Sequence, residues 1–160
     1  MKNANVMWVG LSAKKATNAE DYAPLHIDTN TGKLVAEIEA RCHNINFYKT
    51  NLVKFSPLDS KGKLRYPTLE ECALCYPELQ IEIQAVNPRV VLLLGNKTAT
   101  FVLRQFELRM PKLSYKYHAF EHEKRWYVPI HHPSHILVYR RKEKDQYVRG
   151  VKTVIERLTP

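Results

Sequence analysis

The sequence is poor in several features that mark common classes of protein. It has only three cysteines among 160 residues, and an odd number of cysteines argues against a disulfide framework. Glycines number only five, and neither a GxGxxG nor a Walker A pattern occurs, so the common glycine-rich phosphate loops are excluded. No apolar run approaches the roughly 18–20 residues of a membrane helix. We therefore expect a cytoplasmic protein with no signal peptide and no membrane contact.

Acidic residues are also few relative to basic ones. Sixteen Asp and Glu stand against 25 Lys and Arg, which gives a formal net charge of +9. Such an excess favours an anionic partner, and nucleic acid is the usual one, because phosphate contacts are made mainly by Lys and Arg. The alternative interpretation is charge that serves solubility alone.

The order of the apolar segments predicts an α/β fold. Four runs have the composition of strands: residues 6–9, 45–53, 90–94 and 126–130. Four segments have helical spacing or helix-start signals: residues 33–41, 68–86, 96–106 and 145–158. Their alternation predicts a three-layer α/β/α sandwich around a four-stranded, mostly parallel sheet, in a single domain that spans residues 1–160. Residues 107–124 are compatible with an edge strand or a hairpin.

Polar and basic residues follow each predicted strand. In parallel sheets of this kind, ligands bind outside the carboxyl ends of the strands. Four segments should meet there: residues 10–15, 50–65, 95–97 and 131–144. Gly10 would let the backbone approach a ligand closely. The sequence therefore predicts a site for an anionic ligand at this edge of the sheet.

The densest of these segments follows the last predicted strand. It holds three histidines and a serine within five residues, His131, His132, Ser134 and His135, which are costly to bury unless each finds a partner. Pro133 fixes its own φ and favours extended backbone at the residue before it. This pattern indicates a strand end that turns sharply and presents imidazole and hydroxyl groups. The alternative is a polar loop in which Ser134 only caps the next helix.

Three motifs occur in a fixed order along the chain. They are GLSAK at residues 10–14, TNLVK at residues 50–54 before Pro57 and a Thr-x-x-Glu helix start, and HPS at residues 132–134. Together with the strand that ends at Gly95, the ordered set resembles the uracil-DNA glycosylase superfamily, and most closely its iron–sulfur branch. The resemblance extends over residues 6–158.

The resemblance implies a DNA N-glycosylase that removes uracil, or a related deaminated base, in base excision repair. Such enzymes flip the base out of the duplex and break the N-glycosidic bond through an oxocarbenium-like sugar. His132 matches the residue that stabilises the negative charge of the departing base. Asn51 matches the base-reading asparagine, whose amide can donate to uracil O4 and accept from N3–H. The alternative for Asn51 is a turn residue at a strand end.

The first motif departs from the family pattern. The family usually offers a carboxylate or an asparagine there, which positions water as a general base. Leu11 and Ser12 occupy those places, so Ser12 is the catalytic candidate beside His132. Glu20 or Asp21, in the following loop, could take the same role.

The resemblance also places residues around the flipped base and the DNA backbone. Gly10 and Leu11 would line the base pocket, and Leu25 or Tyr22 would stand where the family stacks an aromatic ring. Ser134 would bind a flanking phosphate, with His135 and Ile136 as candidate wedge residues in the minor groove. The predicted DNA-binding residues are Lys14, Lys15, Ser134, His135, Arg140 and Arg141.

The iron–sulfur cluster of the branch is expected to be absent. Such clusters use four cysteine ligands, whereas Cys75 matches one of them, Phe55 stands where another belongs, and the N-terminal pair is missing before the first strand. We expect neither a cofactor nor a metal. The alternatives are a zinc site built from Cys42, His43, Cys72 and Cys75, or buried free cysteines.

Two functions besides the glycosylase remain open. One is a non-catalytic DNA- or nucleotide-binding protein on the same scaffold, which would keep His132 and Asn51 for recognition. The other is an unrelated phosphate-ester enzyme, which the lack of a glycine-rich loop and of paired carboxylates at strand ends disfavours. We expect DNA as the partner and a monomer as the oligomeric state.

Overall fold

The computed structural model describes residues 3–13 and 24–160. Its centre is a five-stranded sheet in the order β2-β1-β3-β5-β4. The strands are β1 (Val6–Ser12), β2 (Phe47–Val53), β3 (Val90–Leu94), β4 (Phe120–His122) and β5 (Arg125–Ile130). All neighbouring pairs are parallel except β4 with β5. The expected mostly parallel α/β sandwich is confirmed, but the strand count of four was wrong, because the short β4 adds an antiparallel edge strand.

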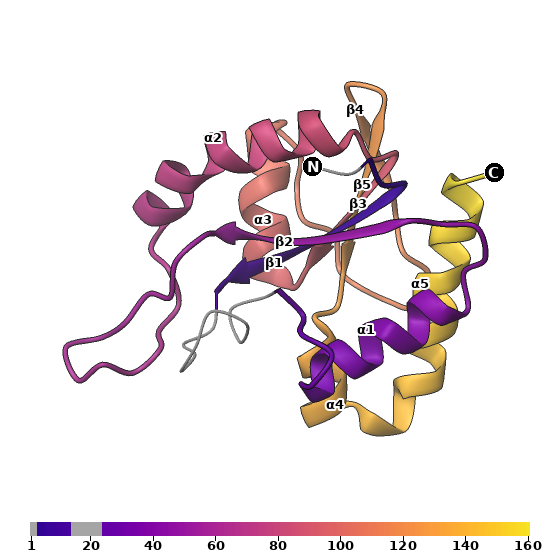
Figure 1. Ribbon diagram of the computed structural model, residues 1–160, viewed down its shortest axis with the longest axis horizontal. Coiled ribbons are helices and arrows are strands. Elements are labelled where there is room, and N and C mark those ends of the chain that lie inside the picture. Colours follow the sequence, from indigo (N-terminus) through magenta and orange to yellow (C-terminus); the bar gives the residue numbers. More distant parts are fainter. Residues whose placement is uncertain (1–2, 14–23) are drawn as a thin grey trace.

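Helices cover both faces of the sheet (Figure 1). On one face lie α1 (Asn30–Ala40), α4 (Pro133–Tyr139) and α5 (Lys144–Leu158), with a short 3-10 helix, η2 (Arg141–Glu143), between the last two. On the other face lie α2 (Leu69–Val86) and α3 (Asn96–Gln105). Within the part of the chain that the structure describes, no helix combines the length and the apolarity needed to cross a bilayer.

The central strands are buried on both faces. In β1, Val6 and Trp8 pack toward α1 and α5, whereas Met7 and Val9 pack toward α2 and α3. Strands that contact helices on both sides have near-continuous apolar runs rather than alternation. This explains why β1 and β3 are evident in the sequence.

Local signals fix where two helices begin. Thr68 and Glu71 form the expected capping box at the start of α2, each side chain accepting from the other residue's backbone N–H. Thr29 caps α1 by accepting from the N–H of Gly32 at 2.9 Å. Helix α1 therefore starts before the expected residue 33, and its first turn lies at the edge of the sheet where β1 ends.

Candidate active site

A cavity of about 1560 Å³ lies at the carboxyl ends of the parallel strands. Each of the four expected segments contributes to its wall. Representative lining residues are Ser12 at the end of β1, Asn51 of β2, Gly95 after β3 and His132 after β5. Segments that are far apart in the sequence thus meet because the parallel strands end at the same edge of the sheet.

His132 is held in one orientation by the start of α4. It is the N-cap of this helix, with φ −65° and ψ 134°, and its Nδ1 accepts from the backbone N–H of Ser134 at 3.1 Å. The hydroxyl of Ser134 lies 2.8 Å from the same nitrogen. Because a backbone N–H can only donate, Nδ1 carries no proton, and the neutral ring has its proton on Nε2. The cap is therefore His132, and the alternative in which Ser134 caps the helix was wrong.

Gly10 and Asn51 face each other across β1 and β2. They are partners in the parallel register, and a Cβ added to Gly10 would lie 2.5 Å from Oδ1 of Asn51. The missing side chain at Gly10 thus provides the room for the Asn51 carboxamide. Since Asn51 lies within β2 and not in a turn, the interpretation of Asn51 as a turn residue was wrong.

Gly95 leaves room for His132 in a similar way. Its φ of +86° lies in the region that favours glycine, and a Cβ there would lie 3.4 Å from Cβ of His132. The N–H of Gly95 donates to the carbonyl of Ile130 at 2.9 Å, which ties the end of β3 to the end of β5. From the sequence, Gly10 was predicted as a site residue, whereas Gly95 was placed at the site edge without a role of its own.

The other predicted site residues divide into three groups. Besides Gly10, Asn51, His132 and Ser134, five of them line the cavity: Leu11, Ser12, Leu25, His135 and Arg140. Arg141 lies in η2, where its Nε donates to the carbonyl of Leu137 at 3.3 Å, and it is not among the lining residues. The remaining candidates lie outside the described residues: Lys14, Lys15, Glu20, Asp21 and Tyr22.

Helix α4 differs from the expectation in its wedge residues. Ile136 is fully buried in the core against α1 and α5, so its assignment as a wedge was wrong. The exposed apolar side chains of α4 are Val138 and Tyr139, at 68% and 76% exposure, and both line the cavity. In this seven-residue helix, residues only two positions apart, such as Ile136 and Val138, lie on the buried and the exposed side.

The rim of the cavity is positively charged. Among its described residues, the ionisable side chains besides histidine and tyrosine are Arg65, Lys97, Lys112 and Arg140, and none is acidic. Lys97 Nζ lies 4.6 Å from the ring centroid of Tyr66, a cation–π contact between α3 and the loop after β2. Such a rim attracts an anion. Sequence reasoning missed Lys112, because residues 107–119 form no regular element.

His131 supports the strand end from inside the core. It is 8% exposed, and its Nδ1 lies 2.6 Å from the hydroxyl of Tyr117. The Tyr147 hydroxyl donates to the His131 carbonyl at 2.9 Å. Burial, aided by the nearby charge of Arg140, lowers the pKa of His131 from 6.5 to about 4. His131 is therefore a neutral structural residue that holds the backbone next to His132.

Acid should destabilise the protein through His131. Its pKa is about 4 in the folded chain and 6.5 when unperturbed, so the unfolded chain takes up the proton first. The stabilisation is fully present above pH 6.5 and is lost as the pH falls through 4, by about 3 kcal/mol. Urea unfolding across this range measures the loss. The double variant His131→Phe with Tyr117→Phe should show a shallower pH dependence, and an equal dependence would contradict the assignment.

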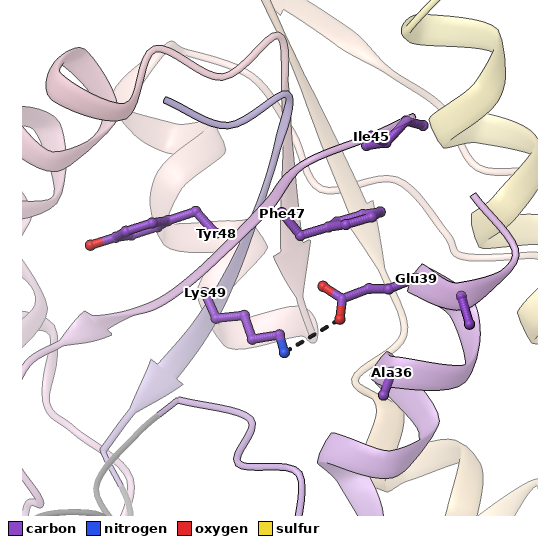
Figure 2. Close-up of a pocket in the computed structure, with 7 residues that line it drawn as sticks. Ala36, Glu39, Ile45, Phe47, Tyr48 and Lys49 are labelled. Carbon is purple, nitrogen blue, oxygen red and sulfur yellow. Dashed lines mark ion pairs between the residues drawn. The ribbon is translucent and has the colours of Figure 1, made fainter. Parts of the chain in front are cut away.

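A second, smaller cavity of about 580 Å³ lies between α1 and the edge strand β2. Figure 2 shows Lys49 and Glu39 facing each other in it, with Nζ and Oε1 3.3 Å apart. Glu39 also accepts from the indole N–H of Trp8 at 3.2 Å. The carboxylate of this cavity is thus already paired, and the cavity lies away from the carboxyl ends of the strands.

The cysteines do not form a metal site. Cys42 packs in the core with α1 and α5, whereas Cys72 and Cys75 belong to α2 and are buried on the other face of the sheet. All three are free and buried, and burial raises the pKa of the Cys72 thiol. No group of three or more metal-ligating side chains occurs within residues 3–13 and 24–160. The zinc alternative was wrong, and the described residues do not fit a four-cysteine cluster.

Comparison with known proteins gives three results. Residues 3–154 match the Uracil DNA glycosylase superfamily. A type-4 uracil-DNA glycosylase from Archaeoglobus fulgidus is 30% identical over 133 residues, which cover 78% of this chain and 64% of that protein. The chain thus spans less than two thirds of that relative's length. The crystal structure of SMUG2 from Pedobacter heparinus matches with a TM-score of 0.63 and 14% identity, covering 99% of this chain and 76% of the other, which shows a common fold.

Proposed function

Because the chain belongs to the uracil-DNA glycosylase superfamily, we propose that it is a DNA N-glycosylase that removes uracil or a related deaminated base. The observation that carries this proposal is that His132 and Asn51 line the same cavity. Each side chain stands at the carboxyl end of a parallel strand, and each lies against a glycine that leaves room for it. The positive rim suits a DNA backbone.

His132 would stabilise the leaving base. When the bond between C1′ of the sugar and N1 of uracil breaks, its electron pair moves onto the base, and negative charge develops on the carbonyl oxygens of the base. With Nδ1 occupied by Ser134, the neutral imidazole offers Nε2–H as a hydrogen-bond donor toward that charge. A donor that is already oriented needs no reorganisation during the reaction. Water then adds to the oxocarbenium sugar and releases a proton.

Asn51 would select the base. Its carboxamide carries a donor and an acceptor side by side, and uracil offers the complementary O4 acceptor and N3–H donor. Cytosine presents the reverse pattern at the same two positions. Because Asn51 lies in β2 opposite Gly10, the strand pairing limits where the amide can move.

The wall of the cavity lacks a carboxylate among the described residues, and this observation favours a second candidate function. A protein that binds DNA or a nucleotide without cleaving it would need recognition by Asn51 and His132 but no group that positions water. Under the glycosylase proposal, Ser12 at the end of β1 supports the water, with Glu20 or Asp21 as alternatives.

The two functions are separated by whether product forms. A labelled oligonucleotide with one deoxyuridine is incubated with the protein, and alkali then cleaves at abasic sites. The glycosylase proposal expects cleavage at the uracil position. Salt-dependent DNA binding without cleavage at uracil, hypoxanthine or xanthine would favour the binding protein and refute the catalytic role of His132.

Gly10→Ala should impair base excision with little loss of stability. The new methyl group would lie 2.5 Å from Oδ1 of Asn51, and the side-chain amide must move while the backbone can stay. A shift of about 1 Å can cost roughly 10²-fold in rate. The measurement is kcat/KM on the deoxyuridine substrate beside the thermal midpoint. An unchanged kcat/KM would show that the amide position does not matter.

A further inference from the structure

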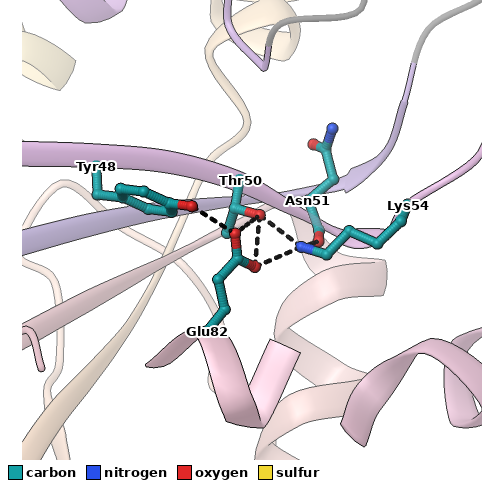
Figure 3. Close-up of polar contacts among 5 residues, drawn as sticks. All are labelled: Tyr48, Thr50, Asn51, Lys54 and Glu82. Carbon is teal, nitrogen blue, oxygen red and sulfur yellow. Dashed lines mark hydrogen bonds and ion pairs between the residues drawn. The ribbon is translucent and has the colours of Figure 1, made fainter. Parts of the chain in front are cut away.

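Lys54 follows directly after β2 and lies at the centre of a polar cluster. Its Nζ donates to Oγ1 of Thr50, to the backbone carbonyl of Asn51 and to Oε1 of Glu82, each at 2.5 Å (Figure 3). The side chains of Lys54 and Glu82 are 24% and 13% exposed. All three donors of the ammonium group therefore have acceptors, and the amine has a defined place.

Glu82 connects this cluster to helix α2. It accepts from the hydroxyl of Tyr48 at 2.8 Å and from the hydroxyl of Thr50 at 2.8 Å. Burial and the hydrogen bond to Glu82 raise the pKa of Tyr48 to about 12, so the phenol keeps its proton and donates at neutral pH. The carboxylate of Glu82 thus joins α2 to Tyr48 and Thr50 of β2.

The position of β2 explains why Asn51 needs such support. Among the described strands, β2 stands at the edge of the sheet beside β1, and the long loop of residues 54–67 follows it. Figure 3 shows the carboxamide of Asn51 pointing away from Glu82, while the carbonyl of the same residue faces the amine of Lys54. In a strand, the direction of a side chain follows from the orientation of its backbone. Holding the carbonyl therefore holds the amide.

We propose that Lys54, anchored by Glu82, is a positioning residue that orients the carboxamide of Asn51 and so contributes to the choice of base. This inference rests on the proposed function of Asn51. A pair that merely joined α2 to β2 would affect stability but would leave the preference among bases unchanged. A positioning role predicts a loss in selectivity, because a site built on paired hydrogen bonds rejects the wrong base only while its donors and acceptors are aligned.

The test compares Lys54→Met with Lys49→Met. Lys49 lies within β2, the strand that Lys54 follows, and forms a similar part-buried ion pair, but its partner is Glu39 of α1, at 3.3 Å. Lys54→Met should lower kcat/KM on deoxyuridine DNA about tenfold to a hundredfold and reduce the ratio of uracil to cytosine excision. Lys49→Met should change neither, and Lys54→Arg should recover most of the loss.

Two additions keep the outcome clear. Lys54→Met leaves the Glu82 carboxylate without its cation, which can destabilise the fold, so Lys54→Met with Glu82→Gln is measured as well. The side-chain amide resonances of Asn51, identified by their loss in Asn51→Ala, should shift or broaden in Lys54→Met and in its double variant with Glu82→Gln, and stay unchanged in Lys49→Met. Unchanged resonances would overturn the positioning role, whether or not the wild type cleaves uracil. An inactive wild type with shifted resonances would refute the proposed function alone.

Discussion

Replacing His132 with alanine or serine should lower the rate of uracil excision about 10²–10³-fold, the usual effect of removing one oriented donor to a developing negative charge. Both substitutions remove Nε2–H. They differ in a second property, because His132 is also the N-cap of α4. Serine is a good N-cap and alanine is a poor one, with a difference of about 1 kcal/mol. The pair therefore separates the chemistry of the ring from its structural role.

Single-turnover rates on a deoxyuridine oligonucleotide and thermal midpoints are measured for both variants. Equal loss of rate, with a lower midpoint for alanine only, would support the donor role. A serine variant that retained the wild-type rate would refute it, since the cap alone would then be what activity requires. Ser134→Ala is a useful third variant: it removes the hydroxyl near Nδ1 but keeps the backbone N–H, so it should have a smaller effect.

Asn51→Asp should abolish most uracil excision, with a loss of at least about 10²-fold in kcat/KM. The carboxylate has nearly the same shape as the amide, but it only accepts hydrogen bonds. It would face uracil O4 with a second acceptor where the amide offers a donor. The same variant should lose its preference for uracil over cytosine, because the donor that distinguishes the two bases is gone.

Asn96→Asp is the matched control for this substitution. Asn96 lines the same cavity and stands in the first turn of α3, where a carboxylate is favourable to the helix dipole. It adds the same charge to the site without touching the strand that carries Asn51. If both variants lose activity equally, the negative charge itself weakens DNA binding, and the base-reading role of Asn51 is refuted.

The predictable parts of the fold were those with a local cause. The runs of β1 and β3 are apolar because both faces of the strands are covered, and the capping box of Thr68 and Glu71 needs only neighbouring residues. The site edge followed from parallel pairing, which places segments after each strand together. The family resemblance, drawn from three ordered motifs, is confirmed by the match over residues 3–154.

The parts that escaped prediction depend on distant contacts. An edge strand or hairpin was expected within residues 107–124, but the bounds of the three-residue strand β4 depend on its pairing with β5. Which side of α4 faces the core was set by α1 and α5, so Ile136 could not be distinguished from Val138 by spacing. The placement of the cysteines on opposite faces of the sheet likewise required the fold. Lys54 and Glu82 are 28 residues apart, and no local pattern joins them.

The two glycines at the strand ends also bear on how this scaffold can be altered. At Gly10 and Gly95, an added carbon would compete for space with Asn51 and His132. A larger residue is therefore not accommodated at either position without moving Asn51 or His132. Changes that leave Asn51 and His132 in place are therefore best made in the loop of residues 54–67 and on the exposed side of α4. Sequence variation is therefore best tolerated at the rim of the cavity.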